Sequence, residues 1–339
     1  MGVTPTVERL SSPQLPDLSK RDSWTSRLIE HLSGIETPGG GVDHLHSPDA
    51  LTAIRSQDRQ SLSALPFPSR RQEDWRFTDL SPLQGMRPQL LDPQPVGTGH
   101  PPAADGCLRL VLDSGGDPLS PAAWPRGIKP IACDELASLL GAGLQTTRCR
   151  DAWPVVLNGA GADQVLALRV TGSVAPTLEL VSDAGAAAGV KPLRILLVLE
   201  ADASLDLSQV LLSSGANLTS VVLEARLGEG ARLRHAVVGR GSHGSALLAH
   251  LAIVQEPSSE LSLTTVMSGW GLARLEPRIH QSRGAAHTRL RALQLATDQQ
   301  LVDTHSHVHF GGPAGSLDQV HKAVSYTHLT LPTTIELCR

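Results

Sequence analysis

The 339-residue sequence is poor in aromatic residues, which make up only 3% of it, whereas apolar residues make up 40%. Its core must therefore be built mainly from aliphatic side chains. The formal net charge of -4 gives no basic patch for nucleic acid, so we expect no nucleic-acid partner. Apolar runs such as ILLVL at 195–199 are too short to span a bilayer, and the opening MGVTPTVERLSS is not a secretory signal. We therefore expect a cytoplasmic protein with no membrane partner.

The cysteines form no CxxC pair, which argues against a zinc or disulfide framework. Cys107, Cys133 and Cys149 are expected to be buried thiols or bystanders. The stretch GRGSHG at 239–244 matches GxGxxG, but a dinucleotide site needs a helix directly after it, and SALLAHLAIV reads as a strand. No GxSxG elbow, P-loop or HExxH motif occurs. The sequence therefore gives no motif for a catalytic site or a tightly bound cofactor.

Residues 1–103 read as a helical region followed by a linker. The apolar residues at helical spacing in the first expected helix are Leu18, Trp24, Leu28 and Leu32. Gly34 is suited to end that helix, and a second helix starts with Ser47 as N-cap and Pro48 at its first position. Residues 104–153 follow as a small α/β segment, with a strand at CLRLVLD and a helix at CDELASLLGAG.

From 154 to 324 the chain becomes a series of short β-like runs separated by Gly, Pro and acidic turns. Leucines recur within these runs at a nearly constant interval, at Leu205, Leu233, Leu261, Leu290 and Leu317. A fixed spacing of this kind is typical of a solenoid, and strands in each unit make it a β-helix. A β-sandwich is the alternative, but nothing in a sandwich keeps leucines in step over five units. The fold class is therefore mostly β, with an incomplete β-helix core.

The stretch DTHSHVHF at 303–310 places an aspartate and three histidines at alternate positions. Alternate side chains of a strand share one face. The face expected to point into the stack holds Thr304, Ser306, Val308 and Phe310, and the outward face holds Asp303, His305, His307 and His309. Two imidazoles about 6.5–7 Å apart can share a metal ion. The outward row His305, His307 and His309 is thus a metal-site hypothesis; the alternative is a polar strand face that a partner subunit covers.

Two further segments of the sequence are distinctive. The first is SRRQEDWRFTDLSPL at 69–83, and the second is THSHVHFGGPAGSLDQVHKAV at 304–324. Both resemble segments of SufD-type proteins of the SufB/SufD family, the second its late coils. The residues of the first segment that match are Arg70 or Arg71, Glu73, Asp74, Trp75, Arg76, Phe77, Thr78 and Asp79.

The resemblance implies a non-catalytic scaffold subunit of the SUF iron–sulfur cluster assembly complex. Its implied fold is a right-handed parallel β-helix after an N-terminal helical region. The implied partners are SufB, through the β-helix, and the ATPase SufC, through a C-terminal domain. A transient iron–sulfur cluster would form on the complex, and the partner ATPase would use ATP. The alternatives are a SufB-type paralogue, a β-helical metal-dependent enzyme that uses the histidine row, and a carbohydrate-active β-helix.

The end of the sequence departs from this resemblance. The string VSYTHLTLPT at 324–333 matches the translation of a transposase adapter used in sequencing libraries. We therefore expect residues 325–339 to be derived from an adapter and the chain to be a fragment, so that Cys338 has no functional role. A long-read sequence of the gene across the Val324 codon tests this expectation.

Overall fold

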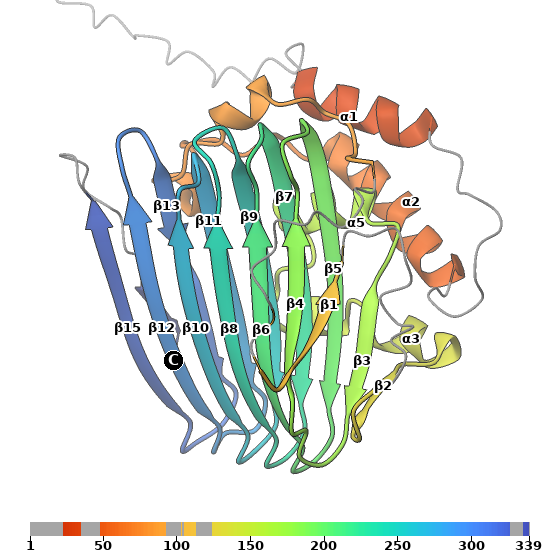
Figure 1. The fold of residues 1–339 in the computed structure, drawn as a ribbon, viewed down its shortest axis with the longest axis vertical. Coiled ribbons are helices and arrows are strands. Elements are labelled where there is room, and N and C mark those ends of the chain that lie inside the picture. The colour runs from red at the N-terminus through yellow and green to blue at the C-terminus, as the bar shows by residue number, and fades with distance from the viewer. Residues whose placement is uncertain are drawn as a thin grey trace, which may run out of the picture.

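The computed structural model describes residues 23–34, 48–92, 103, 105–112, 124–325 and 335–338. Two long sheets lie face to face, and the chain passes from one to the other at each turn (Figure 1). All strand pairs are parallel except the one between β2 and β3. The mostly β, parallel β-helix expectation is confirmed.

The strands of the seven-stranded sheet, in spatial order, are β1 (Cys107–Val111), β4 (Thr177–Asp183), β6 (Ser204–Leu212), β8 (Arg232–Arg240), β10 (Glu260–Ser268), β12 (His287–Ala296) and β15 (Ser316–Ser325). Those of the nine-stranded sheet are β16 (Ile335–Cys338), β14 (Ser306–Phe310), β11 (Leu272–Gln281), β9 (Ala246–Gln255), β7 (Asn217–Leu227), β5 (Gly189–Leu199), β3 (Leu166–Val170) and β2 (Ile128–Pro130). Strand β13 (Leu301–Thr304) also pairs with β11. Each coil of the solenoid is one strand from each sheet.

The core fills the space between the two sheets with aliphatic side chains. In β8 and β10 every second residue is buried, which is the pattern of a strand with one face in a core. Stacking puts the inward residues of each coil against those of the next, so leucine, valine and alanine fill most of the interior. Trp270 is the one tryptophan among the buried residues of this main cluster.

The strand register corrects one part of the predicted leucine row. Leu205 lies opposite Leu233, and Leu233 lies opposite Leu261, as the repeat predicts. In β12, however, Thr288 lies opposite Leu261, whereas Leu290 lies opposite Leu263. The predicted pairing of Leu290 with Leu261 is therefore wrong by two positions.

The cause of this shift lies in the turns. Three residues, 269–271, separate β10 from β11, whereas five residues, 241–245, separate β8 from β9. The next turn, 282–286, is one residue longer than its counterpart at 256–259. The coil is therefore one residue short. A displacement of two residues keeps the same face of a strand inward, so both Thr288 and Leu290 are buried and the core is preserved.

The turns that lead into β6, β8, β10, β12 and β15 share one backbone feature. Each contains a residue with a positive φ between 53° and 68°, and these residues are Asp202, Gly230, Ser258, Ala285 and Ala314. A small residue follows each of them, and these residues are Ala203, Ala231, Ser259, Ala286 and Gly315. The Asp202 N–H donates to the carbonyl of Glu229 in the next coil at 2.8 Å, so the hydrogen-bond ladder continues through the turn. A left-handed residue before a small one is thus the local signature of each coil.

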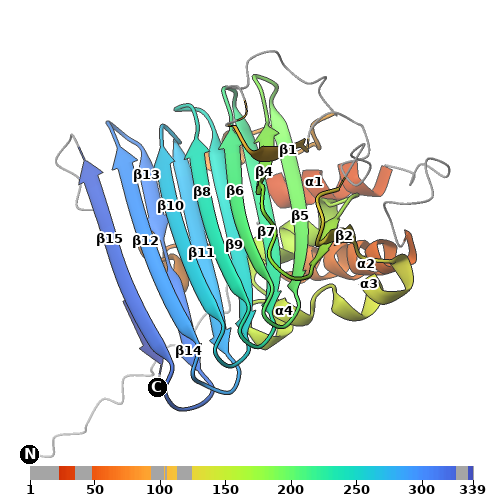
Figure 2. The same cartoon turned by 60° about the horizontal axis from the view of Figure 1, so that its bottom comes forward.

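The helices lie against the nine-stranded sheet (Figures 1 and 2). They are α1 (Ser23–Gly34), α2 (Pro48–Ala64), α3 (Cys133–Leu139), α4 (Ala142–Thr146) and α5 (Trp153–Gly161), with short 3-10 turns η1 (Glu73–Trp75) and η2 (Ser81–Gly85). Helix α5 packs on β5, β7 and β9, and α2 packs on α5. No helix within the described ranges is long and apolar enough to cross a membrane.

Two expected boundaries differ from the structure. Residues 154–161 are expected in the β-helix core, but Trp153–Gly161 is a buried helix, and β3 begins at Leu166. A short apolar run such as WPVVL fits either a buried strand or a buried helix. In the expected α/β segment, β1 pairs with β4 and β2 pairs with β3, so this segment extends both sheets of the solenoid. Leu18 and Ser47 lie outside the described residues.

GRGSHG spans the last two residues of β8 and four residues of the turn before β9, and a strand follows that turn, as the sequence predicts. Cys149 is buried, whereas Cys107 and Cys133 are half-buried.

His235 is a polar exception inside the core. It lies on β8 between Leu207 of β6 and Leu263 of β10, it is 1% exposed, and neither ring nitrogen has a hydrogen-bond partner. Burial lowers the pKa of His235 to about 3. The unfolded chain binds a proton on this residue below about pH 6.5, so acid favours unfolding from about pH 6.5 down to about pH 3.

We expect His235→Leu to raise the free energy of unfolding at neutral pH by about 1–3 kcal/mol, because it removes a buried group whose hydrogen bonds are unmade. It should also remove a slope of about 1.4 kcal/mol per pH unit between pH 6.5 and 3. Urea unfolding at several pH values checks both effects, with the exposed His243→Leu as the control. A variant with an unchanged acid slope would contradict the assignment of that slope to His235.

Candidate functional site

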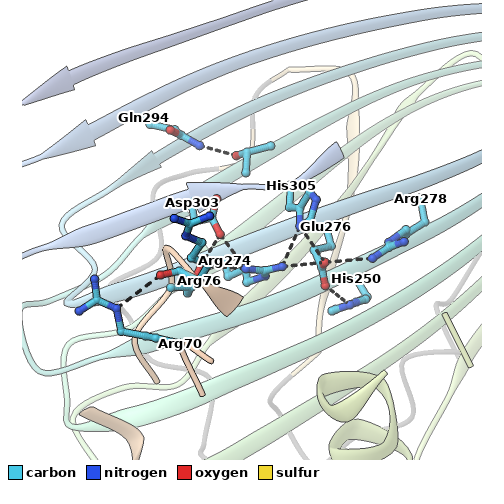
Figure 3. Close-up of polar contacts among 11 residues, drawn as sticks. Arg70, Arg76, His250, Arg274, Glu276, Arg278, Gln294, Asp303 and His305 are labelled. Carbon is cyan, nitrogen blue, oxygen red and sulfur yellow. Dashed lines mark hydrogen bonds and ion pairs between the residues drawn. The ribbon is translucent and has the colours of Figure 1, made fainter. Parts of the chain in front are cut away.

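The histidine row lies on the outer face of the nine-stranded sheet, as the strand alternation predicts. Val308 is 1% exposed and belongs to the core, and Phe310 packs against it. Asp303 and His305, however, are 6% and 8% exposed, so this part of the row is covered. The cover is a segment of the same chain, residues 69–86, which we call the N-terminal strap. Asp303 and His305 of the row meet the strap over β11 (Figure 3).

Arg274 of β11 is the centre of this site. One terminal nitrogen of its guanidinium donates to Asp303 Oδ2 at 2.9 Å and to Thr78 Oγ1 of the strap at 2.8 Å. The other donates to Glu276 Oε1 at 3.0 Å and to His305 Nδ1 at 2.9 Å. Because a guanidinium has no acceptor, His305 Nδ1 is the unprotonated nitrogen of that ring. Four groups from three segments of the chain therefore converge on one cation.

Glu276 extends this cluster to β9. Its second carboxylate oxygen contacts His250 Nε2, and Arg278 lies 3.4 Å from the first. Burial alone would raise the pKa of Glu276, but His250, Arg274 and Arg278 together hold that pKa well below its ordinary value. Glu276 therefore stays ionised and pairs with the cations around it. We call Arg274, Glu276, Asp303, His250 and His305 the Arg274 cluster.

The strap explains the conspicuous EDWRFTDL motif. The Trp75 ring lies under the Arg274 guanidinium, with 4.1 Å from the guanidinium carbon to the ring centroid. The Thr78 hydroxyl donates to Asp303 while it accepts from Arg274, and Thr78 is 1% exposed. Asp79 accepts from the N–H of Ser81 at 2.9 Å and fixes the turn that follows. Phe77, by contrast, is 50% exposed. The inward residues of the motif thus fasten the strap to the solenoid.

The far end of the strap is fastened to α1. Trp24 donates from its indole nitrogen to the carbonyl of Met86 at 2.9 Å. Leu80, Leu83 and Met86 are buried in the same cluster as Trp24, together with Leu272 of β11. The strap therefore links the N-terminal helix to the outer face of the solenoid.

The three predicted metal ligands have separate surroundings. His305 accepts a hydrogen bond from Arg274, and a cation at that nitrogen opposes a metal ion there. The His309 ring stacks on that of His280, with centroids 4.7 Å apart, and His307 is half-buried. In the residues that the structure describes, no group of three His, Cys, Asp or Glu side chains is placed to hold a metal ion. The metal-site hypothesis for His305, His307 and His309 stays a prediction.

A proline explains why the row is interrupted. Strand pairing with β11 stops between β13 and β14, at His305, although the register is the same on both sides: Arg274 pairs with Asp303, and Arg278 pairs with His307. Pro277 of β11 lies at this level and has no N–H to donate to the next coil. The interruption is therefore local, and it leaves the two halves of the row in register.

We expect Thr78→Val to loosen the strap, because it removes the hydroxyl that joins Arg274 to Asp303 while it keeps the side-chain shape. The cost of leaving these buried groups short of a partner is about 1–3 kcal/mol. Limited trypsin digestion should then cut faster at Arg70, Arg71 and Arg76. Thr264→Val, on an exposed strand face, serves as the control. Equal cleavage rates in the two variants would show that Thr78 does not fasten the strap.

The span around this site matches a known family. Residues 182–328 match the SufBD core domain of the SUF system for FeS cluster assembly. That match supports the SufB/SufD family. The matched span begins at the end of β4 and includes every coil from β5 to β15. The Arg274 cluster lies inside the matched span, and the strap binds it from outside.

Two curated proteins are similar to the chain. An iron–sulfur cluster assembly SufBD family protein of Synechocystis sp. is 30% identical over 141 residues, which cover 39% of this chain and 31% of that protein. The chloroplastic protein ABCI7 of Arabidopsis thaliana is 23% identical over 299 residues, which cover 81% of this chain and 62% of that protein. The chain thus spans less than two thirds of the length of both relatives. Both likenesses agree with the match of the core domain.

Sequence reasoning missed the residues that hold the row in place. Arg274, Glu276 and Arg278 alternate along β11 in the stretch RLEPR, as the histidines do one coil later. The parallel register between these coils sets Asp303 beside Arg274. The alternating charges in an otherwise apolar strand were a signal that could have found the cluster.

Proposed function

We propose that the chain is a SufD-like, non-catalytic scaffold subunit of the SUF complex. In this proposal it pairs with SufB through its β-helix and works with the ATPase SufC, which uses ATP. The iron–sulfur cluster is cargo that is assembled on the complex. The observation that carries the proposal is the match of residues 182–328 to the SufBD core domain, which covers the coils from β5 to β15.

The strap favours the SufD type over the SufB type. Its EDWRFTDL segment resembles SufD-type proteins, and here Trp75 and Thr78 of that segment contact the solenoid directly. A segment of this kind fixes how the N-terminal helical region sits on the solenoid. The Arg274 cluster and the adjoining Arg278 carry two arginines and two carboxylates, and the strap contacts Arg274 and Asp303 among them. This arrangement suits a permanent clamp within a scaffold, because its charges are already paired.

The proposal is tested by co-expression with SufB and SufC from the same genome. The tagged chain should co-purify with SufB at a one-to-one ratio and should have no ATPase activity without SufC. As a control, the Arg283→Ala chain, which carries an exposed change away from the strap, should co-purify with SufB as the unchanged chain does. If the tagged chain instead replaced SufB in a complex with an authentic SufD, the SufB-type alternative would be correct. Purification without either protein would contradict the scaffold proposal.

The histidine row gives the second alternative, a β-helical metal-dependent enzyme. It predicts bound zinc or iron in stoichiometric amount, lost when His305, His307 and His309 are all replaced. Metal analysis of the purified chain and of the triple variant decides between the two, since the scaffold proposal predicts no change in metal content.

A further inference from the structure

The outer face of the seven-stranded sheet is unlike the outer face of the other sheet. Helices α4 and α5 pack on β7 and β9 of the nine-stranded sheet, whereas no helix in the described part of the chain lies over β8, β10 and β12 (Figures 1 and 2). We call the outward residues of β6, β8, β10, β12 and β15 the open face. Most of these side chains are exposed or half-buried.

A groove with a volume of about 700 Å³ crosses the open face at the beginnings of β6, β8, β10, β12 and β15. Its floor includes Ser262, a small residue. On one side of β10 it is lined by Arg232 and Arg234 of β8, and on the other side by His287 and Arg289 of β12. Strands β8 and β12 are two strand spacings apart, about 9.5 Å. An extended peptide chain that lies over β10 therefore crosses this groove at one end, between these side chains of β8 and β12.

The open face changes character toward the other end of β10. Val266 lies between Val238 of β8 and Leu293 of β12, and Val238 lies beside Val210 of β6. Val238 is 39% exposed, which is high for an aliphatic side chain on a sheet. Along β10, the open face therefore passes from arginines at the groove to aliphatic residues beyond it, within the length of one strand.

The charge of the open face is opposite to that of the chain. Its positive residues are Arg232, Arg234, Arg240, Arg289, Arg291 and Lys322, and its negative residues are Asp206, Glu260 and Asp318. The face therefore has three more positive than negative charges, whereas the whole chain has a net charge of -4. The ion pairs within it are exposed: the side chains of Arg234 and Arg289 are 75% and 62% accessible. Such pairs contribute little, so carboxylates of a ligand can replace their acidic partners.

We propose that the open face binds an extended segment of another protein that has carboxylates in one half and aliphatic side chains in the other. The carboxylates pair with Arg232, Arg234 and Arg289, and the aliphatic half covers Val238, Val266 and Leu293. A second copy of the chain would bring one positive face against another, which opposes its pairing. A uniform polyanion would leave the aliphatic residues of the open face exposed to solvent. The surface lies on the opposite sheet from the strap, so the proposal goes beyond the scaffold function and does not depend on it.

Fluorescence anisotropy with synthetic peptides tests this proposal. The probe is a labelled peptide of about ten residues, the length of β10 when extended, with glutamates in one half and leucine and valine in the other. We expect saturable binding of the probe that weakens about tenfold or more in Arg234→Glu/Arg289→Glu and also in Val238→Asp. Arg283→Glu, an exposed charge reversal outside the open face, should leave binding within about twofold. Urea unfolding checks that all variants stay folded.

Three results would overturn the proposal. The first is that a peptide of the same composition with its residues scrambled binds as tightly, or that polyglutamate competes equally well; either result reduces the face to a general anion-binding surface. The second is that light scattering shows a dimer that Val238→Asp dissociates, which would make a second copy the occupant. The third is that the wild-type chain shows no saturable binding of the probe.

Discussion

Replacing Arg274 with alanine is expected to lower the free energy of unfolding by about 3–5 kcal/mol, because it leaves buried carboxylates without their cation. Asp303 loses its ion pair, and Glu276 keeps only His250 and the more distant Arg278. Burial then raises the pKa of Glu276 with less opposition, so the variant should also unfold at a higher pH than the wild type when acidified. The sign follows because a carboxylate held below its ordinary pKa stabilises the fold above that ordinary value and loses this effect as pH falls through the lowered pKa.

Urea unfolding at neutral pH and acid titration followed by circular dichroism measure the two effects of Arg274→Ala. The matched control is Arg283→Ala, whose side chain is 67% exposed and whose ion pair with Glu256 is on the surface, so its cost should be below about 1 kcal/mol. A triple change of Arg274, Glu276 and Asp303 to apolar residues should recover part of the loss, because it removes the unpaired charges together with their cation. If Arg274→Ala cost no more than the control, the cluster would not be a clamp.

The solenoid could be predicted from the sequence because the residues of its core recur at a regular interval. Leu205, Leu233 and Leu261 keep one position over three coils, and their strands stack in the predicted register. The prediction fails at Leu290 because it assumes that a leucine takes the same position in every coil. In the structure, the residue that takes the same position in every coil is the small one after each left-handed turn residue. Ala286 and Gly315 mark those positions in the last two coils, and their spacing follows the register. Turn chemistry is the better guide where a turn changes length.

The face of the histidine row was also predictable, since alternation along a strand decides it. What covers that face was not, because the covering segment is distant in the sequence. Thr78 and Asp303 are 225 positions apart, and no periodicity joins them. The motif that contains Thr78 indicated a family, but only the structure shows that its inward residues bind Arg274. In the sequence, the only local sign of this contact is the presence of charged residues in an apolar strand.

Changing Glu224 to alanine is the other substitution for which we expect a large effect. Glu224 of β7 is 1% exposed and pairs with Arg194 of β5 at 2.7 Å, while its carboxylate accepts from the N–H groups of Gly141, Gly143 and Leu144 at 2.9–3.3 Å. It therefore fastens the α3–α4 region to the sheet. Without the carboxylate, a buried guanidinium and three N–H groups lose their acceptor, and the expected loss is about 3–5 kcal/mol.

The design that isolates this effect uses Glu224→Gln beside Glu224→Ala. Glutamine keeps the shape and one acceptor oxygen but places donor hydrogens against N–H donors, so it should recover only part of the stability. Glu229→Ala, an exposed change on the turn after β7, is the control and should stay within about 0.5 kcal/mol. Hydrogen exchange at Gly143 and Leu144 should rise in both Glu224 variants before global unfolding, because their N–H groups lose the carboxylate. Protection that fell only with global unfolding would mean that α4 is held by apolar packing through Leu144, and the carboxylate would then be incidental to this contact.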